Sequence, residues 1–219
     1  MPTIVVASPK GGAGKSTTAV LLGTELAHQG VPVTMLDCDP NRSLTLWSDQ
    51  AELPQNIAVL SDISEAEIVR TIKTHDGDGQ VVIVDLEGVA SRLVSRAISQ
   101  ADLVLTPMRA TTLDATIGAR ALQLIAEEEE ALDRRIPHAV VFTMNKAIQS
   151  KQHKGIELAL REQDVDVIDP PLMERAAFSG LFAFGGDLYS MPAQGNMQGA
   201  RDNARAFAMQ VYKRLAGEA

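Results

Sequence analysis

Two lysines and three glycines lie together near the start of the chain, directly after the apolar segment from Thr3 to Ala7. The loop contains Lys10, Gly11, Gly12, Ala13, Gly14, Lys15, Ser16 and Thr17. A strand that ends in a glycine-rich turn and opens a helix directs backbone N–H groups and the positive end of the helix dipole at one spot, which suits a triphosphate. The sequence therefore predicts a phosphate-binding loop in which Lys15 contacts the β- and γ-phosphates and the Ser16 hydroxyl helps to hold Mg²⁺.

The front of this loop differs from the ordinary motif G-x-x-x-x-G-K-[ST]. Pro9 stands where that motif has its first glycine, and Lys10 adds a second positive charge. Lys10 is too close to the phosphates to be without effect. On the same γ-phosphate as Lys15, however, it would meet like-charge repulsion. A separate function is therefore expected for Lys10.

The loop resembles the deviant Walker A motif of the ParA/MinD family of ATPases, in which the front lysine reaches across a dimer to the nucleotide of the partner. The resemblance extends along the chain. Asp37 to Pro40 is similar to switch I of the family, Asp85 stands in the Walker B position, and Leu86 to Gly88 stands where switch II begins. The segment from Thr111 to Asp114 is similar to a helix start in the family. Asn41 and Arg42 replace the common Gln-Gly after switch I.

The resemblance assigns a function to each residue of the site. It implies that Ser16, Asp37 and Asp85 hold Mg²⁺, which needs few protein ligands because water and phosphate supply the rest. Asp39 would orient the attacking water, and Lys10 would act in trans as an arginine finger does. The catalytic residues would be Lys10, Lys15 and Asp39. ATP would be bound by residues of the loop and of two later segments, namely Gly11, Gly12, Ala13, Gly14, Lys15, Ser16, Thr17, Asn145, Pro170 and Pro171.

Short apolar runs alternate with helical stretches, which predicts an α/β fold with a mostly parallel sheet and helices on both faces, as in P-loop NTPases. Strands are expected at 3–7, 33–36, 57–60, 81–84, 102–105, 138–142 and 164–168. Helices are expected at 15–29, 43–51, 64–75, 90–100, 113–133, 150–163, 174–183 and 199–216. With 219 residues and no divider rich in Pro, Gly or Ser, residues 1–219 are expected to form one domain without the N-terminal helix-turn-helix of larger ParA proteins.

Composition excludes several classes of protein. The one cysteine, Cys38, allows no internal disulfide and no cysteine-ligated cluster, which separates the chain from nitrogenase iron proteins. No apolar run is long enough for a membrane span, so a cytosolic protein is expected. The apolar face of 199–216 is small and alanine-rich, which favours packing against the domain over a MinD-type membrane helix.

Charge is unevenly distributed within a net charge of −8. Residues 1–133 hold 9 Lys and Arg against 19 Asp and Glu, whereas residues 134–219 hold 11 against 9. Cations in the second part could converge as a DNA-facing patch or could be solvated helix faces. They are Lys146, Lys151, Lys154, Arg161, Arg175, Arg201, Arg205, Lys213 and Arg214.

The resemblance implies a small ParA-type ATPase that forms a homodimer around ATP and Mg²⁺. Such a protein would bind nonspecific DNA on the nucleoid, respond to a small centromere-binding or ATPase-activating partner, and segregate a plasmid or a chromosome. One alternative is a MinD-like or other cargo-positioning ATPase on a membrane or a protein assembly. A second is an ATP-dependent biosynthetic ligase of the same superfamily, which Lys10 disfavours.

Overall fold

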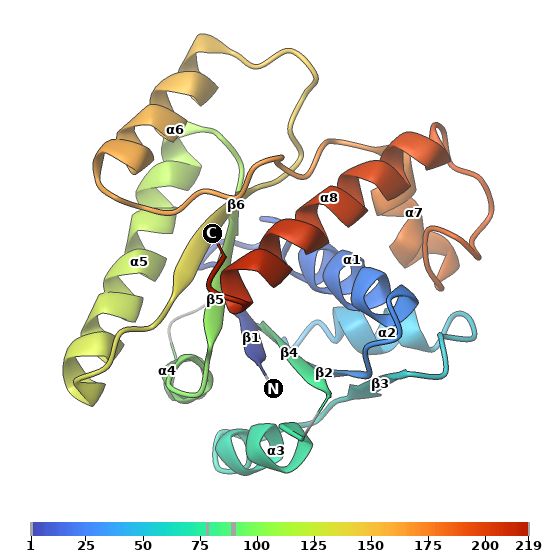
Figure 1. Ribbon diagram of the computed structural model, residues 1–219, viewed down its shortest axis with the longest axis horizontal. Helices are drawn as coiled ribbons and strands as arrows, with labels where there is room; N and C mark the ends of the chain where they lie inside the picture. The colour runs from blue at the N-terminus through green and yellow to red at the C-terminus, as the bar shows by residue number, and fades with distance from the viewer. Residues whose placement is uncertain (1, 78, 89–90, 219) are drawn as a thin grey trace.

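The computed structural model describes residues 2–77, 79–88 and 91–218, and Figure 1 shows a sheet with helices on both sides. The strands are β1 (Thr3–Val6), β2 (Val33–Cys38), β3 (Ile57–Leu60), β4 (Val81–Leu86), β5 (Leu103–Met108) and β6 (His138–Phe142). The helices are α1 (Lys15–His28), α2 (Ser43–Ser48), α3 (Ile68–His75), α4 (Arg92–Ile98), α5 (Thr112–Leu132), α6 (Lys151–Glu162), α7 (Ala176–Phe184) and α8 (Met197–Leu215).

All six strands of the sheet are parallel, in the order β3-β2-β4-β1-β5-β6. The strands β1 and β4 are buried along their whole length, as expected for a parallel sheet that is covered on both faces. The predicted α/β class and the mostly parallel sheet are confirmed. Because parallel strands share one direction, the loops that follow β1, β2, β4, β5 and β6 all leave from the same edge, which we call the carboxyl edge.

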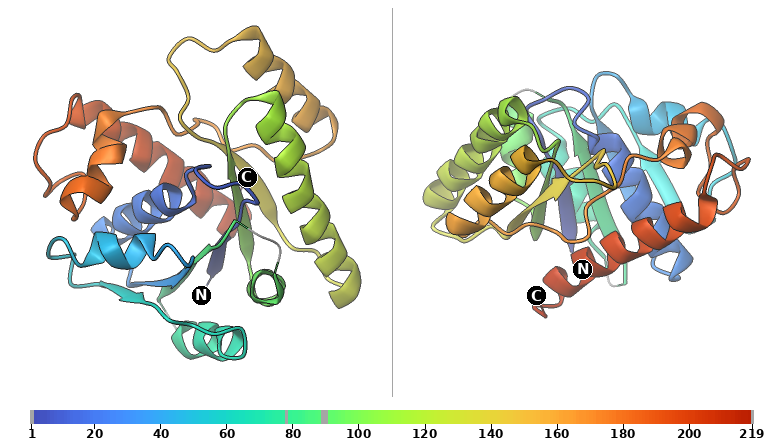
Figure 2. Two further views of the ribbon diagram at one scale, coloured as in Figure 1. Left: turned by 180° about the vertical axis from the view of Figure 1, so that it is seen from behind. Right: turned by 90° about the horizontal axis from the view of Figure 1, so that it is seen from above.

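Two apolar clusters attach the helices to the two faces of the sheet. One joins the sheet to α1, α2, α7 and α8, with Leu22, Trp47 and Phe207 fully buried. The other joins it to α3, α4 and α5 through residues such as Ile68 and Ile98. The two opposite views in Figures 1 and 2 show α1 and α8 side by side, and α4 and α5 on the other side of the strands. Both faces of the central strands are therefore closed, and the carboxyl edge is where polar groups can gather.

The seventh strand predicted at 164–168 is wrong. Only one isolated bridge forms there, between Val140 and Val167: the Val140 N–H donates to the Asp166 carbonyl oxygen, and the Val140 carbonyl oxygen accepts from the Ile168 N–H. The segment then reaches Pro170 and Pro171, which have no backbone N–H to continue a ladder. Pairing with β6 resumes only at the Leu172 N–H, which donates to the Phe142 carbonyl oxygen at 2.9 Å.

Most predicted helices are present, with shifted ends. The helix predicted at 64–75 begins at Ile68 and is preceded by a turn in which Glu67 accepts hydrogen bonds from Ser64. The helix predicted at 90–100 begins at Arg92, and residue 90 lies outside the described residues. The predicted helix 43–51 ends at Ser48. No helix in the described part of the chain is long and apolar enough to cross a membrane.

Candidate functional site

The loop between β1 and α1 is held in a shape that depends on glycine. Gly12 and Gly14 have positive φ angles of 72° and 90°, a region that other residues rarely adopt. A Cβ atom on Gly14 would also lie 3.3 Å from the side chain of Thr143, whose hydroxyl donates to the Ala13 carbonyl oxygen at 2.7 Å. The loop is therefore fixed against the residue that follows β6.

Lys15 lies at the start of α1 with its side chain only 7% exposed. Its Nζ is 3.8 Å from Oδ2 of Asp39, and the other oxygen of Asp39 accepts hydrogen bonds from the backbone and side-chain nitrogens of Asn41. The structure thus brings together two of the three predicted catalytic residues. Asn41, which departs from the common family sequence, orients the carboxylate of Asp39.

Lys10 has a different partner from Lys15. Its Nζ donates a hydrogen bond to Oδ1 of Asp114, a carboxylate that is 2% exposed at the start of α5. The backbone N–H of Asp114 is in turn bonded to the hydroxyl of Thr111, the N-cap of that helix. In this structure Lys10 is therefore paired within its own chain, with a residue to which the sequence analysis gave no function in the site.

Asp85 is a fully buried carboxylate at the end of β4. Neither of its oxygens has a hydrogen-bond partner of good geometry in the described part of the chain. Burial raises the pKa of Asp85 from 3.8 to about 7, although the Ser16 hydroxyl and the Lys15 ammonium nearby act in the opposite direction. A buried acid without a partner is expected to be stabilised by a bound cation.

This burial leads to a pH-dependent prediction. Because the pKa of Asp85 is raised in the folded state, the folded protein holds the proton more tightly than the unfolded chain. The stability of the nucleotide-free protein should therefore fall as the pH rises from the unfolded pKa near 3.8 toward 7. A shift of this size corresponds to on the order of 4 kcal/mol. The Asp85→Asn variant should lose that pH dependence, as measured by thermal unfolding at pH 5 and pH 8 without nucleotide or Mg²⁺. Identical pH profiles for the variant and the wild type would contradict the assignment.

Asp37 and Ser16 complete the predicted metal ligands. Asp37 lies opposite Asp85 in the register of β2 and β4. One of its oxygens accepts hydrogen bonds from the backbone N–H and the hydroxyl of Thr45 in α2, at 2.8 and 2.7 Å. Asp37 therefore anchors α2, whereas Asp85 has both oxygens free. No group of three His, Cys, Asp or Glu side chains that could hold a metal occurs in the described residues. A hydroxyl with one or two carboxylates nevertheless fits Mg²⁺ that keeps phosphate and water ligands.

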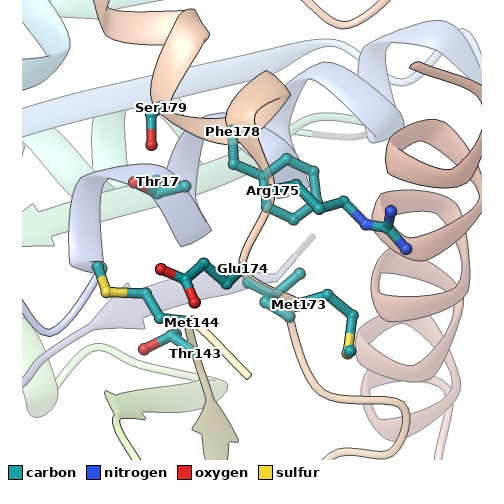
Figure 3. Close-up of a pocket in the computed structure, with 10 residues that line it drawn as sticks. Thr17, Thr143, Met144, Met173, Glu174, Arg175, Phe178 and Ser179 are labelled. Carbon is teal, nitrogen blue, oxygen red and sulfur yellow. The ribbon is translucent and has the colours of Figure 1, made fainter. Parts of the chain in front are cut away.

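A pocket of about 120 Å³ opens beside the loop. It is lined by Gly14, Thr17, Thr143, Met144, Leu172, Met173, Glu174, Arg175, Phe178 and Ser179. In Figure 3 the carboxylate of Glu174 points toward Met144 and Thr143, whereas the guanidinium of Arg175 points away toward α8. Apolar walls next to a glycine-rich loop, with a few polar groups, are the usual lining of a nucleotide-base pocket.

Three residues predicted to bind ATP, namely Asn145, Pro170 and Pro171, adjoin this pocket in the chain but do not line it. Asn145 is buried, and its backbone N–H and carbonyl bond to Leu172 and Glu174, while its side-chain Nδ2 has no partner in the described structure. Pro171 faces α8, where its carbonyl oxygen accepts a hydrogen bond from Asn203. The pocket is instead lined by the four residues that follow Pro171, which proline content alone did not indicate.

The nine cations of the possible DNA patch do not converge. Arg214 pairs with Asp166 and lines a hollow with Pro2 and Pro137, at the amino ends of the strands. Arg201 donates to the Leu188 carbonyl oxygen. Lys146, Lys151 and Lys154 lie in the segment that follows β6, at the carboxyl edge. The single converging patch is therefore not present, and the cations divide between opposite edges of the sheet.

A parallel sheet whose first strand leads into this loop, with Asp85 at the end of a neighbouring strand, has the architecture of a P-loop ATPase. Comparison with known proteins agrees. Residues 1–210 match the family described as VirC1 protein. "Protein ParA" of Rhizobium radiobacter is 69% identical over 217 residues, which cover 98% of each chain.

Solved structures show the same fold. The Cyanothece McdA–ATP complex has a TM-score of 0.76 at 21% identity, covering 99% of this chain and 96% of that one. Cobyrinic acid a,c-diamide synthase from Mycobacterium smegmatis, with a bound ATP analogue and magnesium, has a TM-score of 0.74 at 18% identity, covering 100% and 97%. The chain belongs to the VirC1 family and is a P-loop ATPase of the ParA/MinD type.

Proposed function

We propose that this chain binds ATP and Mg²⁺ in the loop between β1 and α1, and that two ATP-bound copies form a dimer that hydrolyses ATP slowly and releases DNA as it does so. The observation that carries the proposal is the division between the two lysines. Lys15 lies inside the loop near Asp39, whereas Lys10 leaves its own loop and is neutralised by Asp114. Lys10 therefore does not share the partner of Lys15, and in a dimer it could exchange Asp114 for the phosphate of the nucleotide that the other subunit binds.

In this proposal Lys15 binds the β- and γ-phosphates together with the backbone N–H groups from Gly11 to Thr17. Asp39, 3.8 Å from Lys15 and held by Asn41, lies where an attacking water beside the last phosphate could be oriented. Lys10 of the partner subunit would stabilise the charge that develops on the transferred phosphoryl group.

The Mg²⁺ site would be formed by Ser16 and the free carboxylate of Asp85, with Asp37 connecting the site to α2 through Thr45. When bound, the ion would supply positive charge that offsets the negative charge of the phosphates. Asp85 holds the ion, and Asp37 keeps the start of α2 in place. A change at switch I can therefore be transmitted to α2.

Adenine is proposed to occupy the pocket beside Met144 and Phe178. Asn145 follows the pocket residue Met144, and its buried side-chain Nδ2 has no partner among the described residues, so a small shift of this segment would let it donate to the base. Pro170 and Pro171 act indirectly, by positioning the segment from Leu172 to Arg175.

The cargo proposal is supported by the 69% identical relative named ParA. We propose segregation of a plasmid or chromosome, with a small centromere-binding or ATPase-activating protein as the partner and the nucleoid as the surface. A relative named "Maintenance of carboxysome distribution protein A" from Halothiobacillus neapolitanus, 22% identical over 196 residues, supports cargo positioning on a protein assembly as the second candidate. The two candidates differ in the partner and share the same dimer.

Sedimentation velocity tests the proposal. With Mg²⁺ and a non-hydrolysable ATP analogue the protein should sediment as a dimer, and with ADP as a monomer. A monomer under both conditions would contradict it. Retention of random duplex DNA with the ATP analogue, and not with ADP, would support the DNA part.

Replacement of Asp39 gives a more specific prediction. In Asp39→Ala the group that orients the water is lost, while Lys15 and the loop that contact phosphate remain. The variant should bind ATP and remain dimeric with ATP itself, because hydrolysis no longer resolves the dimer. Size-exclusion chromatography with ATP and a phosphate-release assay measure both effects. Asn41→Ala is the matched control, since it removes the side-chain hydrogen bond to Asp39, keeps the backbone one, and should reduce the rate less. If Asp39→Ala hydrolysed ATP at the wild-type rate, another residue would have to orient the attacking water.

A further inference from the structure

The arginines of α8 are largely occupied by the protein itself. Besides its bond to Leu188, the guanidinium of Arg201 lies 4.9 Å from the ring centre of Tyr189, and Arg205 donates to the hydroxyl of the same tyrosine at 3.1 Å. Arg214 makes a two-bonded pair with Asp166. These side chains tie α8 to neighbouring segments. Binding a phosphate would compete with the bonds that they already make.

The segment from 146 to 154 is different, and we call it the lysine segment. It contains Lys146, Lys151 and Lys154, all exposed, and no Asp or Glu occurs between positions 134 and 156. None of these three lysines lies within ion-pair distance of a carboxylate in the part of the chain that the structure describes. The lysine segment is therefore a local concentration of positive charge on a protein whose net charge is −8.

The lysine segment is firmly anchored. Ser150 caps α6 by accepting a hydrogen bond from the His153 N–H at 3.1 Å, and the His153 ring packs against Phe142. Gln152 donates to the hydroxyl of Thr112 at 2.7 Å, next to the helix start that holds Asp114. Lys151 and Lys154 are therefore presented by a capped helix start, whose backbone dipole also favours an anion, and Lys146 follows Asn145, whose backbone is bonded to Leu172 and Glu174.

The segment is also close to the proposed nucleotide. Thr143 and Met144, immediately before it, line the pocket, and Thr143 is bonded to Ala13 of the loop. In Figure 1 α6 and the loop before it lie on the opposite side of the molecule from α3, which has its own exposed cations Arg70 and Lys73. A dimer formed through the nucleotide edge would bring two lysine segments to that edge.

We propose that the lysine segment is the surface that holds the backbone of duplex DNA in the ATP-bound dimer, and that the arginines of α8 are structural. This inference rests on the proposed function. The chemistry fits a polyanion that is bound without sequence preference, because lysines act as point charges toward phosphate. The only aromatic ring of the segment, that of His153, is buried against Phe142, so no base can stack on it. Its one strongly exposed apolar residue, Ile148, is too little for a membrane-surface helix.

The test compares variants of equal charge. Lys146→Ala/Lys151→Ala/Lys154→Ala removes the lysine segment, and Arg70→Ala/Lys73→Ala/Arg135→Ala removes three exposed cations from elsewhere. Fluorescence anisotropy with random duplex DNA, Mg²⁺ and the ATP analogue gives affinity as a function of salt. The first variant should bind at least about 10-fold more weakly, with a salt slope smaller by about 0.9 for each DNA phosphate that the protein no longer neutralises. The second should match the wild type. Sedimentation should show that both variants still dimerise.

The outcomes separate this inference from the function on which it rests. If the wild type dimerises but does not bind duplex DNA, both the DNA part of the proposed function and this surface are overturned. If the wild type binds DNA and the lysine-segment variant binds it equally well, only the surface is wrong, and Arg201→Ala/Arg205→Ala would then be expected to lose binding. Retention of all three charges in Lys146→Arg/Lys151→Arg/Lys154→Arg should preserve binding. Binding of the wild type to phosphatidylglycerol vesicles in place of DNA would also overturn the inference.

Discussion

Replacing Lys10 with alanine is expected to lower ATP turnover by roughly 10³-fold or more, the range in which removal of a trans-acting arginine finger falls. The reason is geometric. Lys10 is paired with Asp114 and not with the acid that faces Lys15, so its loss should leave the nucleotide contacts of its own subunit in place. In the proposed dimer it is the cation that meets the transferred phosphoryl group of the partner. Binding of ADP to the monomer should remain close to wild type, as titration with a fluorescent ADP analogue can show, while dimerisation with the ATP analogue is lost.

Asp114→Asn is the matched variant for this experiment. It breaks the same ion pair but leaves the lysine in the protein, so turnover should be largely retained. If Lys10→Ala and Asp114→Asn were equally inactive, the intramolecular pair itself would be what matters. If Lys10→Ala dimerised and turned over normally, Lys10 would be only a loop residue.

Replacing Lys15 with alanine is expected to weaken nucleotide binding by about 100-fold, since charge-assisted bonds to phosphate and the pairing of a buried group are removed together. The side chain is almost completely buried, and in this structure only Asp39 is within ion-pair distance of it among the described residues. Unlike Lys10→Ala, this variant should fail with both ADP and ATP. Equilibrium binding of a fluorescent ATP analogue measures the effect, with thermal unfolding as the control for folding. If Lys15→Ala bound the nucleotide as tightly as the wild type, the assignment of this loop to the nucleotide site would be wrong.

The parts of the site that could be predicted from sequence are those whose position depends only on the neighbouring residues in the chain. Lys15 and Ser16 follow glycines directly, and Asp85 follows an apolar run, so that strand direction alone brings them to one edge of the sheet. Asp114 could not be predicted in this way, because it contacts Lys10 across 104 positions of the chain. The resemblance of Thr111 to Asp114 to a helix start predicted a helix there, but not what the carboxylate of Asp114 faces.

The prediction of a strand at 164–168 was wrong for a different reason. The run from Val165 to Ile168 has strand-like side chains, and side-chain pattern was the only signal available. Whether such a run joins a sheet depends on backbone N–H groups along its continuation, and Pro170 and Pro171 lack them. As a result, the residues of this segment that line the pocket lie after the predicted Pro170 and Pro171. Its lining comes from Leu172 to Arg175, where pairing resumes beside Asn145.

The unpartnered carboxylate of Asp85 also bears on how long the protein lasts in the cell. An acid buried at the end of a central strand makes the empty form easier to open, and any ligand that neutralises it protects the folded state by mass action. Proteases act on chains that have opened. Copies that carry nucleotide and magnesium should therefore outlive empty ones, so that the amount of protein follows the supply of ATP without any change in its synthesis.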